Sequence, residues 1–149
     1  MILIKEKHIG NEIFFEKIIT SDKGELCSEI RYRSVILEKE SKNYFVIYTP
    51  LMTIHSNAFS FINFFKSSHA DNSRIKAQQA LKLLFSYEKI IGKELAAFIP
   101  TDITNLKYFL HGYSPRGQVI QLELKTNRSN QTVNSYLSIY RQYLSYIGV

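Results

Sequence analysis

The fold of the C-terminal part of the chain is decided by residues 72–91, NSRIKAQQALKLLFSYEKII. Apolar side chains recur there every three or four positions, which predicts an amphipathic α-helix with a buried stripe. That stripe consists of Ala77, Ala80, Leu81, Leu84, Tyr87 and Ile91. Asn72 or Ser73 is the expected N-cap, and Gly92 is expected to end the helix. A second stripe is polar and basic, and we predict that it faces solvent. It comprises Arg74, Gln78, Lys82, Ser86 and Lys89.

Three further helices are predicted around this one. Residues 57–66 are rich in Phe and Ile, so we expect a short helix that is almost wholly buried. A helix following Pro100 has Thr101 as its expected cap and ends at Gly112. The last helix begins at Ser129 or Asn130 and has one apolar and one polar face. Between these two helices, residues 113–128 form a long connection with room for a short strand within 119–125.

The N-terminal residues favour strands, because β-branched and aromatic side chains are dense there and turn formers separate the runs. The runs are 12–20 (EIFFEKIIT), 29–39 and 44–48 (YFVIY). Their order predicts an antiparallel β meander with strand order 1-2-3. The expected fold class is therefore α+β, a small meander followed by a mainly α domain with four helices. We place the boundary between a strand-rich segment, 1–52, and a helical domain, 53–149.

Composition restricts the class of protein. The chain has 149 residues, a single cysteine and no run of about 18 apolar residues, so we expect a cytoplasmic protein that neither crosses a membrane nor needs disulfides. The four histidines are far apart in sequence, and no G-x-G-x-x-G or G-K-[ST] motif occurs. We therefore predict no catalytic residues, no metal site and no cofactor for this chain.

Charge and amide content point to a polyanion. The net charge is +6, and residues 71–149 hold 10 basic against 5 acidic side chains, whereas residues 1–70 hold 9 against 8. Asn and Gln can pair with adenine in the major groove, while Lys and Arg pair with phosphates or guanine. The polar faces of the helices at 72–91 and 130–147 thus suit DNA. A solvated helix face with ordinary caps explains the same pattern.

Two segments carry a resemblance to a known family, residues 72–76 (NSRIK) and 128–137 (RSNQTVNSYL). They resemble the tyrosine recombinases of the phage integrase family. Residues 57–149 look like the SAM-like, core-binding DNA-binding domain that precedes the catalytic domain in members from mobile elements and prophages. The most specific match is the basic-Ser-x-x-Thr-x-Asn-x-Tyr/Leu opening of the last helix. The segment 70–73 departs from the family pattern, because it lacks a proline.

The resemblance implies that this chain grips duplex DNA at a recombination site, while a C-terminal catalytic domain cleaves and joins strands. The implied partners are double-stranded DNA, that catalytic domain and, in a homo-oligomer on DNA, further copies of the chain. The DNA contacts carried over by position are Arg74, Lys76, Gln78, Lys82, Arg128, Asn130, Gln131, Asn134 and Arg141. The family's catalytic Arg, Lys, His-x-x-Arg and Tyr set is missing, so we expect no activity from this chain, which would be the N-terminal region of a longer recombinase.

Two alternatives stay open. The chain could instead be a helical protein-interaction module with an incidental basic face, in which case DNA binding would be weak and insensitive to salt. The strands of residues 1–50 resemble the arm-binding sheet of some integrases, but their near-neutral charge equally fits a scaffold or an oligomer contact.

Overall fold

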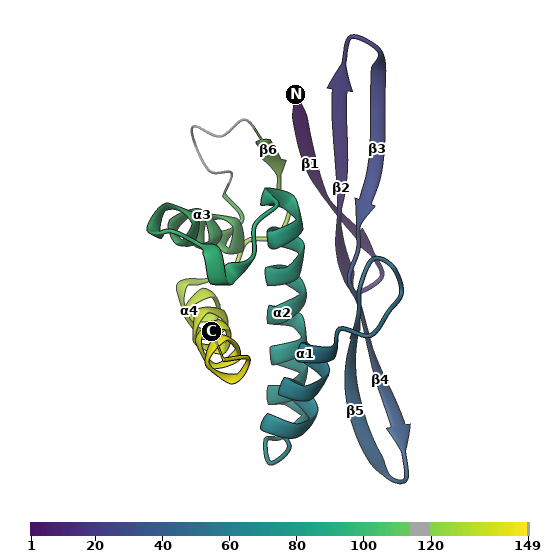
Figure 1. The fold of residues 1–149 in the computed structure, drawn as a ribbon, viewed down its shortest axis with the longest axis vertical. Coiled ribbons are helices and arrows are strands. Elements are labelled where there is room, and N and C mark those ends of the chain that lie inside the picture. The colour runs from purple at the N-terminus through teal and green to yellow at the C-terminus, as the bar shows by residue number, and fades with distance from the viewer. Residues whose placement is uncertain (114–119, 149) are drawn as a thin grey trace. The chain divides into compact units, whose positions relative to one another are not determined.

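The computed structural model describes residues 1–113 and 120–148 and has an α+β fold, as the sequence predicts (Figure 1). Its strands are β1 (Ile2–Ile9), β2 (Glu12–Ser21), β3 (Gly24–Ile30), β4 (Arg33–Lys39), β5 (Lys42–Tyr48) and β6 (Ile120–Glu123). Its helices are α1 (Ser56–Ser60), α2 (Asp71–Ile91), α3 (Pro100–His111) and α4 (Asn130–Tyr146). The π-helical turn η1 (Phe61–Phe65) continues α1, and the 3-10 turn η2 (Leu95–Ala97) precedes α3.

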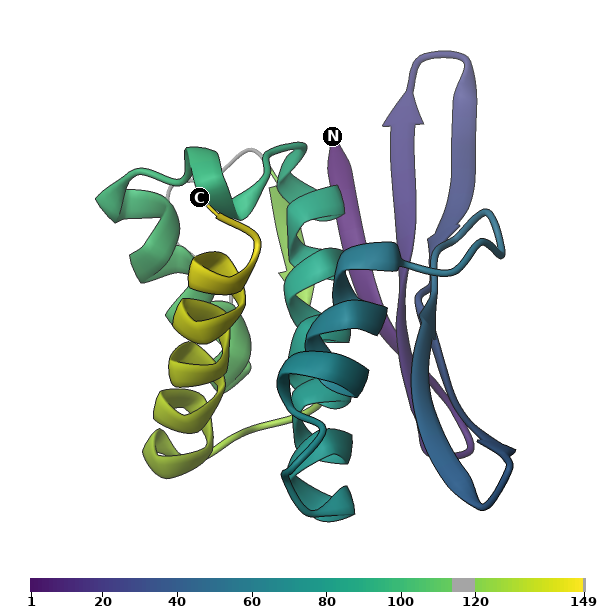
Figure 2. The same ribbon diagram turned by 60° about the horizontal axis from the view of Figure 1, so that its bottom comes forward.

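The predicted antiparallel pairing of consecutive strands is confirmed, but the strands form two sheets, so the predicted order 1-2-3 within one sheet is wrong. One sheet has the order β3-β2-β1-β6, and the other is the β4–β5 hairpin. The predicted run 29–39 divides at residues 31 and 32: Ile30 pairs with Phe15, whereas Arg33 pairs with Tyr48 of the other sheet. Sequence analysis also missed β1. The short strand expected within 119–125 is confirmed as β6, which lies parallel to β1 in both ribbon views (Figures 1 and 2).

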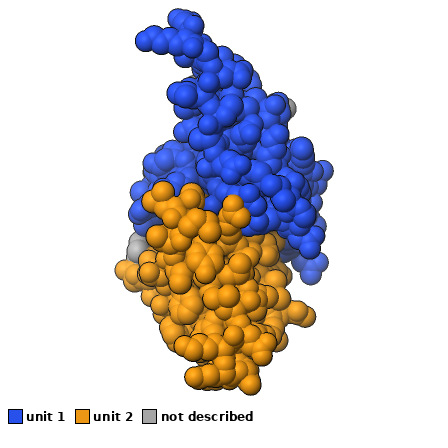
Figure 3. Space-filling model, turned by 90° about the vertical axis from the view of Figure 1, so that its right-hand side faces the viewer, with its two compact units in different colours: residues 1–31, 86–134 blue, residues 32–85, 135–149 orange. Residues whose placement is uncertain are grey.

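The chain forms two compact units, each built from separate stretches of sequence (Figure 3). Unit 1 comprises residues 1–31 and 86–134, and unit 2 comprises residues 32–85 and 135–149. Neither unit coincides with the predicted segments 1–52 and 53–149. Each unit combines strands with helical residues, because a hairpin or small sheet buries one face only against another element.

The core of unit 1 lies between one face of the four-stranded sheet and the helices. Phe15 of β2 packs against Phe109 of α3, with ring centroids 5.4 Å apart, and Phe109 also meets Tyr87 of α2 at 4.9 Å. Ile4 and Leu122 line the same core from β1 and β6. Burial, together with the charge of Asp102, raises the pKa of Tyr87 to about 12.

The core of unit 2 is the junction of the β4–β5 hairpin, η1, α2 and the end of α4. The apolar stripe predicted for α2 is buried over Ala77–Leu84, and Tyr140 of α4 donates a hydrogen bond from its hydroxyl to the carbonyl of Ala80 at 2.7 Å. The predicted near-complete burial of residues 57–66 is wrong. Phe61 and Ile62 are buried, but Phe64 and Phe65 are 62% and 49% exposed. A single turn packs on one side only, so the opposite side stays in solvent.

Helix ends follow local chemistry. The helix α2 begins at Asp71, one residue before the earliest predicted cap. Thr101 is not the cap of α3; instead, a carboxylate oxygen of Asp102 accepts the N–H of Ile99 at 2.9 Å. Ser129 caps α4 as expected, because its Oγ accepts the N–H of Thr132 at 3.2 Å. None of the helices described is long and apolar enough to span a membrane.

Candidate nucleic-acid interface

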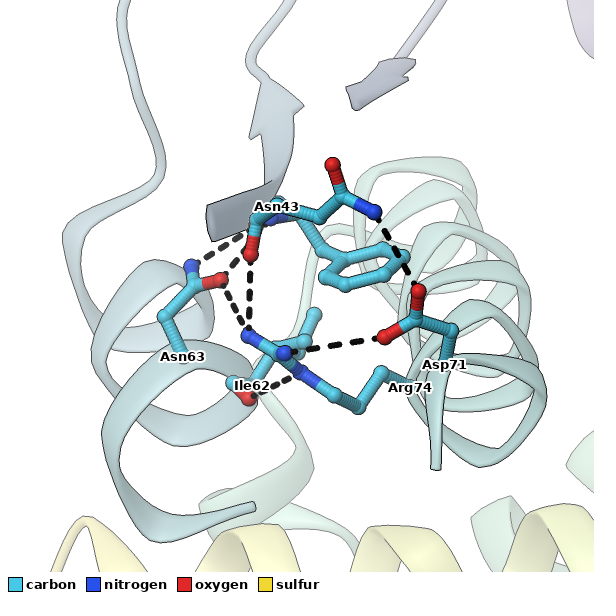
Figure 4. Close-up of polar contacts among 6 residues, drawn as sticks. Asn43, Ile62, Asn63, Asp71 and Arg74 are labelled. Atoms are coloured by element: carbon cyan, nitrogen blue, oxygen red, sulfur yellow. Dashed lines mark hydrogen bonds and ion pairs between the residues drawn. The ribbon is translucent and has the colours of Figure 1, made fainter. Parts of the chain in front are cut away.

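Arg74, the first predicted DNA contact on α2, lies inside unit 2 and connects three elements (Figure 4). Its Nε donates to the carbonyl of Ile62 at 3.3 Å, and its Nη2 donates to Oδ1 of Asn63 at 3.0 Å and to the carbonyl of Asn43 at 3.4 Å. The guanidinium also lies 4.5 Å from the ring centroid of Phe45. The five donors of an Arg fork suit such a junction, so Arg74 joins β5, η1 and α2.

Asn63 completes this junction from the side of η1. Its Oδ1 accepts the N–H of Phe45 at 2.8 Å, and its Nδ2 donates to the carbonyls of Phe45 and Phe59 at 2.9 Å. The side chain therefore pairs with the β5 backbone as another strand would. Asn43 of β5 adds a bond to Asp71 at the start of α2, at 3.2 Å. The tip of the β4–β5 hairpin is thus attached to both helical elements.

The predicted solvent-exposed face of α2 is wrong for most of its length. Gln78 and Lys82 are only 2% and 6% exposed, and Ser86 is also buried. The Nε2 of Gln78 donates to the carbonyls of Val35 and Val46 at 3.0 and 2.9 Å. At Gln78 the backbone carbonyls of the β4–β5 hairpin supply the partners that a buried amide requires. Because Gln78 and Lys82 are buried, we no longer expect them to contact DNA. Arg74 instead stabilises the packing of unit 2.

Of the other predicted contacts, all except Arg128 are exposed. Lys76 is exposed on α2 and lies two residues from both Arg74 and Gln78, so it is on the opposite side of the helix from the covered stripe. On α4 the exposed side chains are Asn130, Gln131, Asn134 and Arg141. Residues 130, 134 and 141 fall on one side of the helix by their spacing, with Ser138 and Ser145 beside them, while Val133, Tyr140 and Tyr143 point into the core. One helix therefore presents two amides and a guanidinium on a continuous polar face.

Arg128 precedes α4 and is half-buried, because it holds the end of α3. Its Nη1 donates to the carbonyl of Leu110 at 3.2 Å. Its backbone N–H donates to the carbonyl of His111 at 3.4 Å, and Nδ1 of His111 lies 3.1 Å from the carbonyl of Arg128. Part of the donor capacity of Arg128 is thus used within unit 1.

A buried carboxylate of β1 lies next to the same connection. Glu6 is 3% exposed, and its Oε2 accepts a bond from Oγ1 of Thr126 at 2.6 Å and meets Nε2 of His8 at 2.5 Å. Burial alone would raise the pKa of Glu6, but the hydrogen bonds from Thr126, His8 and the backbone outweigh it, and the pKa lies below its ordinary value. Glu6 is therefore ionised at neutral pH. Sequence analysis did not single it out.

A buried lysine was also missed. Lys66, at the end of η1, donates from Nζ to Oε1 of Gln142 at 2.9 Å and lies 5.3 Å from the ring centroid of Phe61. Burial lowers its pKa. Neither Lys66 nor Glu6 has a sequence signal that separates it from the many solvated charges of the chain.

Neither metal-ligand geometry nor similarity to known proteins adds a functional assignment. Within residues 1–113 and 120–148, no group of three His, Cys, Asp or Glu side chains is arranged so that it could hold a metal ion. Comparison with protein-family models, with curated proteins and with solved structures finds no match to this chain.

Proposed function

We propose that this chain is the DNA-binding region of a site-specific tyrosine recombinase and that it grips duplex DNA at the recombination site without doing chemistry itself. The observation that carries the proposal is the exposed polar face of α4, formed by Asn130, Asn134 and Arg141 with Gln131 beside it. These residues lie in and beyond the segment 128–137 on which the resemblance to the recombinases rests.

The chemistry of that face suits a DNA groove. An α-helix fits the major groove, where an Asn or Gln amide can donate to and accept from one adenine and an Arg can bind guanine or a phosphate. The N-terminal turn of α4 adds backbone N–H groups at the positive end of the helix dipole. On α2 only Lys76 remains from the predicted set with its ammonium group in solvent. We therefore assign the principal recognition to α4 and a supporting phosphate contact to Lys76.

The direct experiment is a binding titration with two duplexes of equal length, one carrying the end sequence of the mobile element that encodes the chain and one with that sequence scrambled. Measurements at about 50 and 200 mM salt give the slope of log K against log salt. We expect tighter binding to the element end and a negative slope. Arg141→Ala and Lys76→Ala should each weaken binding, and each should reduce the slope by about one unit if the side chain touches a phosphate.

The matched control is Lys23→Ala, which removes the same charge from the β2–β3 turn. It should leave affinity and slope close to those of the wild type. Weak, salt-insensitive binding of the wild-type chain to both duplexes would overturn the proposal and favour the protein-interaction module. Equal losses of affinity from Lys23→Ala and Arg141→Ala would show that binding depends on net charge alone. The helix α4 would then not be the recognition helix.

A further inference from the structure

We propose that Glu6 of β1 is a positioning residue for DNA binding, because it holds the connector between β6 and α4, and that Lys125 and Asn127 of this connector are additional DNA contacts. The connector is defined as residues 124–129. This inference rests on the proposed function, since it concerns how the start of α4 is presented to DNA. All the groups involved belong to unit 1.

The first anchor of the connector is Glu6 itself. Besides the bond from Oγ1 of Thr126, the N–H of Thr126 points to Oε1 of Glu6 at 3.4 Å. The two residues are 120 positions apart in sequence. The parallel pairing of β1 with β6, from Ile2 opposite Ile120 to Lys5 opposite Glu123, brings them together. The pairing of β1 with β6 thus ends at Glu123, and the chain is next held at Thr126 by its hydrogen bonds to Glu6.

The second anchor is the end of α3. Gly112 has a φ of +95°, and a Cβ at this position would overlap the carbonyl oxygen of Thr126 and approach the side chain of Asn127. Next to this close approach, His111 and Arg128 are joined by a backbone hydrogen bond and by a bond between the His111 ring and the Arg128 carbonyl. The connector is therefore held on one side by β1 and on the other by α3, directly before Ser129 caps α4.

The hydrogen bonds to β1 and α3 are made by alternate residues of the connector, so it has an inward and an outward face. Thr126 and Arg128 are partly buried and make the inward bonds, whereas Lys125, Asn127 and Ser129 are exposed. This is the alternation of an extended segment. The outward residues continue into the exposed Asn130 and Gln131 at the start of α4. Lys125 offers an ammonium group for a phosphate, and Asn127 offers an amide for a phosphate or a base edge.

The arrangement also explains why a carboxylate is placed next to a DNA-binding segment. A solvated carboxylate would repel phosphates, but Glu6 is buried and its oxygen atoms are occupied by Thr126 and His8. Bonds to an ionised acceptor are stronger than those between neutral groups, so Glu6 restrains the connector more firmly than an amide would. Ordering these residues before DNA arrives reduces the entropy lost on binding.

The test uses the full chain with Thr126→Val, which removes the hydroxyl at constant shape, and Thr126→Ser, which keeps it. Both are checked for folding by circular dichroism and thermal unfolding. We expect Thr126→Val to weaken binding to the element-end duplex about three- to tenfold, and Thr126→Ser to restore most of the affinity. If Thr126→Val does not fold, Glu6→Gln replaces it, because it removes the charge but keeps an acceptor.

A second readout separates positioning from general destabilisation. Lys125→Ala should weaken binding and reduce the salt slope by about one unit in the wild-type background, and should have little further effect with Thr126→Val. Additive losses, or no loss from Lys125→Ala, would overturn the inference while leaving the proposed function intact. If the wild type fails to bind duplex DNA, the proposed function and the DNA role of the connector are both overturned. Amide exchange at Thr126, slow in the wild type and faster in Glu6→Gln, then still reports whether Glu6 holds the connector.

Discussion

Oδ1 of Asn63 accepts two hydrogen bonds, from the Nη2 of Arg74 at 3.0 Å and from the N–H of Phe45 at 2.8 Å. A residue that looks like a DNA contact in the sequence is thereby bound to a buried amide that acts as a strand partner for β5. The relationship explains why a basic residue of α2 faces inward. Its donors reach three acceptors on η1 and β5, namely the carbonyls of Ile62 and Asn43 and Oδ1 of Asn63.

Arg74→Ala should lower the free energy of unfolding by about 2–4 kcal/mol, because it leaves the acceptors on Ile62, Asn63 and Asn43 with fewer donors and removes the guanidinium from the Phe45 ring. Urea unfolding at neutral pH measures this. The control is Lys76→Ala two residues later, which is exposed and should stay within about 0.5 kcal/mol of the wild type. Similar small effects from both substitutions would mean that the junction does not depend on Arg74.

Gly112→Ala should destabilise the protein more than Gly92→Ala. Both glycines have a positive φ, +95° and +68°, so both substitutions carry the cost of a left-handed backbone, about 1 kcal/mol. Only at Gly112 would the new Cβ meet the carbonyl of Thr126, whereas nothing lies within 4 Å at Gly92. The excess for Gly112→Ala should be at least about 1 kcal/mol in thermal or urea unfolding. Equal costs would show that the connector moves aside freely.

Glu88→Gln should stabilise the protein at pH 7 and lose this advantage in acid. Burial and, to a lesser extent, the charge of Glu94 raise the pKa of Glu88 to about 6, although the hydrogen bond from the N–H of Leu95 lowers it. The unfolded chain releases the proton near pH 4.5 and the folded chain only near 6, so wild-type stability falls as the pH rises through this window.

The measurement is the urea midpoint of wild type and Glu88→Gln between pH 4 and 8. The amide keeps an oxygen that can accept the N–H of Leu95, which Glu88 accepts at 2.8 Å. Glu25→Gln on the exposed strand β3 is the control for the same change of side chain at the surface. A constant difference between Glu88→Gln and wild type over this pH range would contradict the raised pKa.

Lys66→Met should give a urea midpoint at pH 7 at least as high as that of the wild type. Met fills a similar volume without the cost of burying an ammonium group, and Gln142 is exposed enough for water to replace the lost donor. Since burial lowers the pKa of Lys66, the wild type should regain stability relative to Lys66→Met as the pH rises toward 10.5. A lower midpoint for Lys66→Met at pH 7 would show that the Gln142 bond and the Phe61 ring outweigh desolvation.

Local patterns were sufficient for the three longer helices and for several of their ends. The spacing of apolar residues predicted α2, α3 and α4 to within a few residues, and Ser129, Gly92 and Gly112 end or begin helices where expected. These features depend on bonds between neighbours in sequence, such as the Ser129 bond to the N–H of Thr132. The same locality explains why the exposed face of α4 was predicted correctly: its apolar stripe is continuous, so the opposite side is left to solvent.

The sheet topology and the polar face of α2 could not be predicted in this way. An unbroken run from residue 29 to 39 gives no local reason to separate Ile30 from Arg33, and the division appears only because Ile30 meets Phe15 while Arg33 meets Tyr48. Likewise, Gln78 and Lys82 have the spacing of a solvated face. The amide of Gln78 is buried with its Nε2 bonded to carbonyls of the β4–β5 hairpin, which lie more than 30 residues away in sequence.

The sequence by itself therefore determined the α+β class, the approximate bounds of α2, α3 and α4, the Ser129 cap and the polar face of α4, because each follows from contacts within a few residues. Only the tertiary structure decided which polar residues reach solvent and which hold the fold together. A buried polar side chain needs a partner, and for Gln78 and Glu6 that partner is supplied by a distant part of the chain. The physical reason is that the spacing of apolar and polar residues shows which residues share a face of a helix. Whether solvent or another element covers that face depends on long-range packing.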